Sequence, residues 1–226
     1  MKTKTKNGKL KILSHSDDPF TDRVEAGELL AEVLIDHAGS QTVILGIPRG
    51  GLVVAREVAR RLKAPLDIVL ARKLGAPQNP ELAIGAITEE GEVFLDEPLA
   101  RRVGASEDYL QQESRSQLQE IQRRSSVYRN IRPKIDLRDK DVIVVDDGVA
   151  TGSTVQAALW SIAREKPHKI TGAFPVGAED SLLRLCDTAD EIICLKAPPS
   201  LGAIGNFYLH FRQVSDQEAL EILNRA

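Results

Sequence analysis

The sequence predicts an α/β fold built on a parallel β-sheet. Short apolar runs rich in β-branched residues alternate along the chain with longer segments whose apolar residues recur at helical spacing. One run, VIVV at 142–145, is apolar at every position, which is typical of a central strand covered by helices on both faces. This alternation favours parallel strands joined by right-handed crossovers.

The first half of the chain predicts the order helix, strand, loop, helix and strand. We expect the helices over 21–37 and 52–62 and the strands over 42–47 and 66–73. Residues 74–81 contain one glycine and two prolines, which predict a loop.

A hairpin and a long helix are expected next. Residues 82–97 are typical of two short strands around the turn EEG. Residues 106–130 contain neither glycine nor proline, and Ser106 is a suitable N-cap for a helix. The sparse apolar residues of this segment predict a mostly solvated helix that packs on a partner chain and is inserted at about 99–132.

The last third predicts further strands and a terminal helix. A strand, loop and helix are expected over 140–166, followed by strands within 168–177 and 190–197. Ser215 is a suitable cap for a helix that runs to the end of the chain. We therefore expect three parts: a basic extension (1–20), a main domain (21–215) and a C-terminal helix (216–226).

Composition excludes several classes of function. The formal net charge of −3 gives no bulk attraction to nucleic acid, and no apolar run approaches the roughly 20 residues of a membrane span. No signal peptide is visible, and the four histidines lack metal-ligand spacing. Cys186 and Cys194 have neither redox nor zinc spacing, so we expect buried free thiols in a reducing cytoplasm. The lysines of the first 11 residues predict a solvated, frayed terminus.

The segment VIVVDDGVATGST (142–154) carries the clearest chemical signal. Ligands of parallel sheets bind at the carboxyl ends of the strands, where Asp146 and Asp147 are expected. Side chains alternate along a strand, so the two carboxylates should diverge and meet different partners. Hydroxyl-rich ligands and hydrated divalent cations are the partners that carboxylates serve best.

A helix predicted to begin near Ser153 would present unpaired N–H groups to an anion such as phosphate. Together with the aspartates, this loop predicts a sugar-phosphate site. The segment is neither the nucleotide P-loop, which needs a lysine, nor the dinucleotide fingerprint GxGxxG. The structural alternative is that Asp147 caps a turn that Gly148 makes.

An apolar strand, two acidic residues and a Thr/Gly/Ser loop resemble the motif by which type I phosphoribosyltransferases bind 5-phosphoribosyl-1-pyrophosphate (PRPP). The resemblance covers roughly 40–215 and implies a Rossmann-like parallel-sheet core with a flexible-loop hairpin. It implies that Asp146 and Asp147 hold the ribose hydroxyls. The residues that it assigns to the 5′-phosphate are Gly148, Ala150, Thr151, Gly152, Ser153 and Thr154. Gly148 is a departure, because the family usually has a small apolar residue there.

The resemblance also implies a pyrophosphate site and a role for Mg²⁺. The expected pyrophosphate-binding residues are Pro48, Arg49, Gly50, Gly51 and Lys73, with a cis peptide at Pro48–Arg49. As catalytic residues, Arg49, Arg72 and Lys73 would neutralise the leaving group, although ordinary surface charge is the alternative for these cations. Mg²⁺ would bridge substrate oxygens and touch few protein carboxylates, for which Asp146 and Asp147 are the candidates.

The acceptor is left open by the sequence. Purine-type members carry a third aspartate in the loop, where this chain has Ala150. Two segments are candidates for the part of the fold that covers the base, and the residues considered are Phe174, Val176, Phe207 and Tyr208. A hydrophobic cover or a dimer contact explains these side chains equally well.

The resulting prediction is a cytoplasmic, homodimeric enzyme that transfers phosphoribosyl from PRPP to a base, with no nucleic acid or membrane as partner. The first alternative is a non-catalytic regulator that binds PRPP or a nucleotide on the same fold. The second is hydrolysis or transfer on another phosphosugar.

Overall fold

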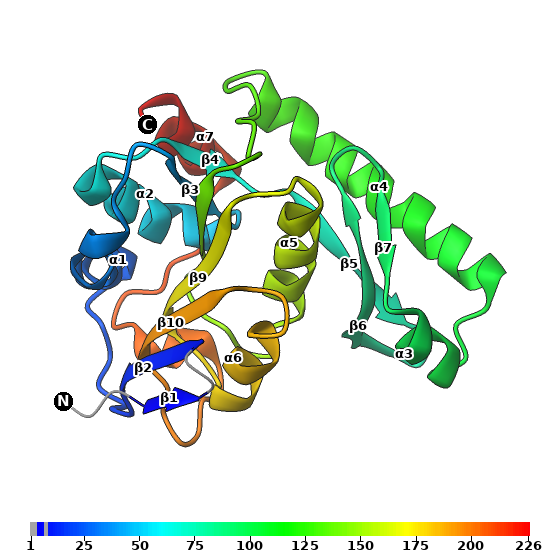
Figure 1. Ribbon diagram of the computed structural model, residues 1–226, viewed down its shortest axis with the longest axis horizontal. Coiled ribbons are helices and arrows are strands. Elements are labelled where there is room, and N and C mark those ends of the chain that lie inside the picture. The colour runs from blue at the N-terminus through cyan, green and yellow to red at the C-terminus, as the bar shows by residue number, and fades with distance from the viewer. Residues whose placement is uncertain (1–3, 7–8) are drawn as a thin grey trace.

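Two β-sheets organise the computed structural model of the chain, which describes residues 4–6 and 9–226 (Figure 1). Within these ranges the larger sheet has seven strands in the order β1-β2-β10-β9-β8-β3-β4, and the smaller has three in the order β5-β6-β7. All neighbours in the larger sheet are parallel except β1 and β2, and the smaller sheet is antiparallel. The strands are β1 (Lys4–Lys6), β2 (Leu10–Ser14), β3 (Thr42–Gly46), β4 (Leu66–Ile68), β5 (Ala71–Ala76), β6 (Asn79–Thr88), β7 (Val93–Leu95), β8 (Asp141–Val145), β9 (Lys169–Val176) and β10 (Glu191–Lys196).

Helices cover both faces of the larger sheet. The helices are α1 (Arg23–Val33), α2 (Gly50–Leu62), α3 (Glu97–Arg102), α4 (Glu107–Arg129), α5 (Ser153–Arg164), α6 (Glu179–Leu185) and α7 (Asp216–Asn224), with short 3-10 turns η1 (Ile35–His37) and η2 (Ile204–Phe207). The central strand β8 shows the layering directly. Ile143 and Val145 pack in the core that contains α1, α2 and α7, whereas Val142 and Val144 pack in the core that contains α5 and α6. The predicted α/β fold with a parallel sheet is confirmed.

The predicted strand over 66–73 is wrong as a single element. β4 ends at Ile68, and β5 begins at Ala71 and leaves the large sheet to pair with β6. The intervening Val69 and Leu70 are buried, so the apolar run continues through the break without a change in its pattern. In Figure 1 the β5–β7 sheet and the long α4 form a separate layer beside α5.

The predicted loop over 74–81 is also wrong, because only residues 77–78 separate β5 from β6. The pairing of the two strands is irregular around Gly75. A Cβ atom on Gly75 would lie 2.8 Å from the carbonyl oxygen of Pro80, so the two backbones approach too closely for any other residue. Glycine and proline here mark a bulge in a hairpin.

The expectation of a frayed terminus over the first 11 residues is wrong for residues 4–6, which form β1, and for residues 10–11, which begin β2. β2 pairs in parallel with β10, and Leu10 and Ile12 are buried. Alternating lysines concealed this strand, because Lys9 and Lys11 flank the buried positions in the sequence. Lys2 lies outside the described residues.

Other expected elements are confirmed. α4 begins after Ser106, whose hydroxyl accepts the backbone N–H of Tyr109 at 3.2 Å. α7 begins after Ser215, which accepts the N–H of Glu218 at 3.2 Å. The hairpin around EEG is present as β6 and β7, whereas α3 and α6 were not predicted as separate helices.

The topology brings several loops to one edge of the large sheet. Because β3, β8, β9 and β10 run in the same direction, the segments that follow them meet at the carboxyl edge. Among the described residues, none of the helices combines the length and the apolar character that crossing a membrane requires.

Candidate active site

The acidic pair follows β8 directly. The backbone N–H of Asp147 donates to Oδ1 of Asp146 at 2.9 Å, which fixes the first carboxylate against its own chain. The second carboxylate points to another partner, since Oδ2 of Asp147 lies 2.7 Å from Nε of Arg23. The two side chains therefore diverge, as their positions at a strand end predicted.

The two carboxyl groups have different electrostatic surroundings. Burial raises the pKa of Asp146 well above its usual range, and the charge on Asp147 raises it further. The hydrogen bond from the Asp147 N–H and the charge of Arg23 oppose this rise. A raised carboxyl pKa in the folded state means that stability is gained below the unfolded pKa and lost as the pH rises through the folded pKa. The buried Asp146 carboxyl group therefore lowers the stability of the fold near neutral pH.

Arg23 joins the acidic pair to two distant parts of the chain. It is the first residue of α1, whose N-cap is Asp22. Its Nη1 donates to the carbonyl oxygen of Arg212 at 2.9 Å, and its guanidinium carbon lies 3.8 Å from the centre of the Phe211 ring. The side chains of Arg23 and Asp147 are 10% and 17% exposed, so this ion pair is largely buried. No local pattern in the sequence indicates the pair, because the partners are 124 positions apart.

The loop after the acidic pair leads into α5. Gly152 adopts φ +78°, which only glycine adopts readily, and it precedes the first residue of α5. A glycine has no side chain with which to cap the helix, so the first N–H groups of α5 are left to other acceptors. The hydroxyls of Thr151 and Ser153 lie 3.2 Å apart at this helix start.

Helix α6 holds the outer side of this loop. Ser181 Oγ donates to the carbonyl oxygen of Ala150 at 2.6 Å, and Arg184 Nη2 donates to that of Thr151 at 3.3 Å. Val149 is tied to the end of β9 through its N–H, which donates to the carbonyl oxygen of Val176 at 2.9 Å. The loop backbone is therefore positioned from two sides.

A packing contact explains the glycine at position 148. A Cβ atom on Gly148 would lie 2.6 Å from Cγ2 of Ile204 and 3.1 Å from Cγ1 of Val176. Ile204 therefore occupies the space that a small apolar side chain would need, so an alanine here would force Ile204 to move.

The segment IPRGG (47–51) packs directly against the acidic pair. Pro48–Arg49 is a cis peptide bond, as the resemblance implied. A Cβ atom on Gly50 would lie 2.0 Å from Oδ2 of Asp147, and one on Gly51 would lie 2.8 Å from Oδ1 of Asp146. The two glycines let α2 begin beside both carboxylates.

Gly50→Ala should displace the Asp147 carboxylate, because the added methyl group cannot share that space, and should thereby weaken by about tenfold the binding of the ribose phosphate that the sequence motif predicts as ligand. Gly39→Ala is the control, since its Cβ would lie an ordinary 3.5 Å from Thr42 Oγ1. Isothermal titration of both variants with PRPP checks the prediction. Equal affinities in the two variants would show that this contact does not position Asp147.

The predicted basic residues lie on two sides of the site. Arg72 and Lys73 are in β5, and Lys73 Nζ lies 2.9 Å from Oε2 of Glu81. The hydroxyl of Ser153 donates to the carbonyl oxygen of Glu81 at 2.6 Å, so one residue of β6 contacts both a cation and the start of α5. Arg49, after β3, lies 3.7 Å from Asp216 of α7.

The residues predicted to cover a base are all buried in this structure. Tyr208 donates its hydroxyl to the carbonyl oxygen of Asp147 at 2.6 Å, and its ring stacks on Phe211 with centroids 5.0 Å apart. Burial, the largest contribution, raises the pKa of Tyr208, which keeps the hydroxyl a hydrogen-bond donor. Each of the four, Phe174, Val176, Phe207 and Tyr208, is at most 5% exposed. Base binding by these residues stays a prediction.

Comparison with known families identifies the fold and the loop together. Residues 22–196 match the family model described as the phosphoribosyl transferase domain. The chain belongs to the phosphoribosyltransferase family. The match contains the acidic pair, the loop that follows it and the IPRGG segment.

Individual relatives of this phosphoribosyltransferase chain are known. It is 42% identical over 207 residues to the Mycobacterium tuberculosis protein named "Putative phosphoribosyl transferase Rv0571c", and equally to its counterpart MT0597 in another strain. These alignments cover 92% of this chain and 47% of each relative, so the chain spans about half of their length. The crystal structure of TT1426 from Thermus thermophilus is 44% identical, has a TM-score of 0.86, and is matched over 92% of this chain and 98% of TT1426.

The described residues give a limited set of ligands for a metal ion. They include no group of three or more His, Cys, Asp or Glu side chains that could hold one. Asp146 and Asp147 are the acidic residues at the site, and Asp147 is already paired with Arg23. This donor set fits an Mg²⁺ ion that arrives on a phosphate ligand and retains water, because Mg²⁺ needs only one or two protein carboxylates.

Proposed function

We propose that this phosphoribosyltransferase uses PRPP as donor, transfers its phosphoribosyl group to a nitrogenous base and releases pyrophosphate with Mg²⁺. The observation that carries the proposal is that two helix N-termini lie beside one pair of carboxylates. The N-terminus of α2, which begins at Gly50 within IPRGG, lies against the same carboxylates that precede the N-terminus of α5. A ribose with a phosphate at each end matches this arrangement.

The residues divide the substrate between them. Asp146 and Asp147 would accept the ribose hydroxyls, and the loop 150–154 would bind the 5′-phosphate through backbone N–H groups and hydroxyls. The segment 48–51 and the cations Arg49, Arg72 and Lys73 would bind the pyrophosphate. Arg23 holds the Asp147 carboxylate in place through their 2.7 Å contact, so it is a positioning residue.

The proposed reaction exchanges one bond at the anomeric carbon. The C1–O bond to pyrophosphate breaks, the C1–N bond to the base forms, and the electron pair leaves with the pyrophosphate. Positive charge develops on the ribose in the transition state, so cations near the leaving group and carboxylates near the ribose are well placed to stabilise it. Mg²⁺, when bound, would neutralise part of the pyrophosphate charge.

The acceptor is assigned only to the class of nitrogenous bases. Ala150 lies where purine-type enzymes have an acid, so the loop offers no carboxylate to take the proton of the base. The proposal extends to a cytoplasmic homodimer. Two free cysteines, Cys186 and Cys194, are compatible with a reducing compartment.

The test is release of pyrophosphate from PRPP and Mg²⁺ with a panel of purine, pyrimidine and other nitrogenous bases. We expect turnover with at least one base. PRPP binding without any turnover would favour the non-catalytic regulator, and absence of both binding and turnover would refute PRPP as the donor.

Asp147→Asn should weaken PRPP binding by about tenfold or more, because a charged acceptor for a ribose hydroxyl is lost and Arg23 is left without its partner. Titration calorimetry measures the change. The control is Asp36→Asn, which alters an exposed carboxylate in η1, after the C-terminal end of α1. Unchanged affinity in Asp147→Asn would exclude the ribose role assigned to this residue.

A further inference from the structure

Helix α4 forms one wall of a cavity at the site. The cavity has a volume of about 230 Å³ and lies between α4, β5 and the residues Ile47 and Pro48, which directly follow β3. The lining residues that lie outside α4 include Pro48, Arg72, Lys73, Glu81 and Thr154. From α4 it is lined by Glu113, Gln117, Ile121 and Arg124. The inserted helix is thus in contact with the space beside the proposed pyrophosphate ligands.

Helix α4 orients one of these proposed pyrophosphate-binding residues, Arg72. Nε of Arg72 donates to Oε1 of Gln117 at 2.8 Å, and the amide of Gln117 in turn donates to Glu113 at 3.0 Å. Arg72 is therefore held by a chain of hydrogen bonds that starts one turn earlier on α4.

Arg124 supplies a further cation on the same wall. Its Nε lies 2.8 Å from Oε1 of Glu120, one turn back on α4. Arg123 makes the same kind of pair with Glu120 at 3.0 Å, but its side chain is 63% exposed and does not line the cavity. Two neighbouring arginines thus share one partner and differ in whether they face the cavity.

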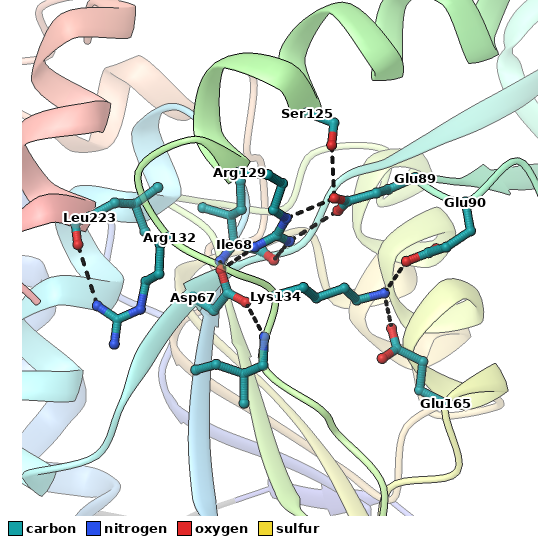
Figure 2. A network of polar contacts seen from close by, with 11 residues as sticks. Asp67, Ile68, Glu89, Glu90, Ser125, Arg129, Arg132, Lys134, Glu165 and Leu223 are labelled. Carbon is teal, nitrogen blue, oxygen red and sulfur yellow. Dashed lines mark hydrogen bonds and ion pairs between the residues drawn. The ribbon is translucent and has the colours of Figure 1, made fainter.

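A buried polar network fixes the position of α4. Figure 2 shows Arg129, at the end of the helix, between Asp67 of β4 and Glu89 of the β6–β7 turn. The guanidinium lies 2.7 Å from Asp67 Oδ1 and 2.7 Å from Glu89 Oε1, and Ser125 donates to Glu89 at 2.8 Å. Asp67 is 1% exposed, so the anchor is internal. Arg124 lies little more than one turn before this anchor.

We infer that α4 completes the pyrophosphate subsite and that Arg124 binds the diphosphate together with Arg72 and Lys73. The inference rests on the proposed function. Glu120 neutralises part of the charge of Arg124 but is shared with Arg123, so four cations face the three carboxylates of Glu81, Glu113 and Glu120, and a net attraction for an anion remains. Guanidinium groups are well suited to bind phosphate oxygens in pairs.

The experiment titrates Mg-pyrophosphate, and separately PRPP, into the full chain and into two variants. Arg124→Gln should weaken pyrophosphate binding by about tenfold, because a charge-assisted contact is lost. Arg123→Gln is the matched control, because it removes the same charge and a pair with the same carboxylate, Glu120, but lies outside the cavity. The affinity of this variant for pyrophosphate should stay within about twofold of that of the unchanged chain. Thermal unfolding of both variants should be alike.

The outcomes separate this inference from the proposed function. If the unchanged chain binds both ligands and Arg124→Gln binds pyrophosphate as tightly, Arg124 is not a ligand and the inference is wrong. Equal weakening in both variants would likewise overturn it, because it would reveal a general effect of surface charge. If the unchanged chain binds neither pyrophosphate nor PRPP, the proposed function itself fails, and the inference fails with it.

Discussion

Arg23→Met should lower the free energy of unfolding by about 3–5 kcal/mol at pH 8, as expected when one partner of a buried ion pair is removed. The guanidinium lies 2.7 Å from Asp147 Oδ2 and is the cation that contacts this carboxylate in the described part of the chain. Without it, two adjacent carboxylates remain at the end of β8, and burial already raises the pKa of Asp146. The charged forms of both carboxyl groups then become costly in free energy.

The loss in Arg23→Met should be smaller at pH 5 than at pH 8. Burial raises the pKa of Asp146 and the charge of Arg23 opposes this rise, so removing Arg23 raises the folded-state pKa of Asp146 further. The contribution of this group to stability is present at low pH and is lost as the pH rises through the folded pKa. Urea denaturation at the two pH values measures this. The double variant Arg23→Met/Asp147→Asn should recover most of the stability at pH 8, since it removes the unpaired charge. A loss that is the same at both pH values would show that Arg23 stabilises the fold only by packing, for instance on Phe211.

Arg129→Met should also destabilise the chain by about 3–5 kcal/mol, because Asp67 and Glu89 would keep their buried charges without a cation. Asp67 retains the backbone N–H groups of Ile68 at 2.7 Å and Ile135 at 3.0 Å, so it loses its charge partner and keeps two donors. Desolvation lowers the pKa of Arg129, but its bonds to Glu89 and Asp67 outweigh this and raise it.

The control for Arg129 is Arg101→Met. Arg101 pairs with Glu97 at 3.1 Å on the surface, with side-chain exposures of 73% and 66%. Its loss should change the free energy of unfolding by no more than about 0.5 kcal/mol. Chemical denaturation measures both variants. Comparable losses in the two would contradict the importance of the buried network in Figure 2.

The parts of the fold that can be predicted from sequence are those with a local physical cause. The helix caps at Ser106 and Ser215 depend on one side chain and a backbone N–H three residues later. The strand 142–145 is apolar throughout because both of its faces are covered. The position of the acidic pair follows from the direction of that strand.

The errors have long-range causes. Nothing in the run 66–73 marks the point where the chain leaves the large sheet, because Val69 and Leu70 stay buried on the way to the hairpin. The lysines near residue 10 suggested solvent, although this segment pairs with β10 and its alternate residues Leu10 and Ile12 are buried. Glycine and proline in 74–81 suggested a loop, whereas they allow a close backbone approach within a hairpin.

The candidate site divides in the same way. The loop and the acidic pair are contiguous in sequence, so one motif predicts both. Arg23, Ile204 and Arg124 come from three distant segments, and their roles depend on which surfaces the fold brings together. A single sequence contains no signal for such contacts.

Glu81 would compete, through its carboxylate, with an incoming anion for Lys73. Its carboxylate lies 2.9 Å from Lys73, while its carbonyl oxygen accepts the hydroxyl of Ser153 at 2.6 Å. An anion that binds to Lys73 must therefore exchange with a group that the chain holds at an effective concentration of about millimolar or more. Added salt weakens the internal pair as well as the incoming one, so the affinity for phosphates should vary less with ionic strength than the number of cations suggests. Binding of an anion to Lys73 would also break this side-chain contact between β5 and β6, which couples occupancy of the site to the freedom of the hairpin.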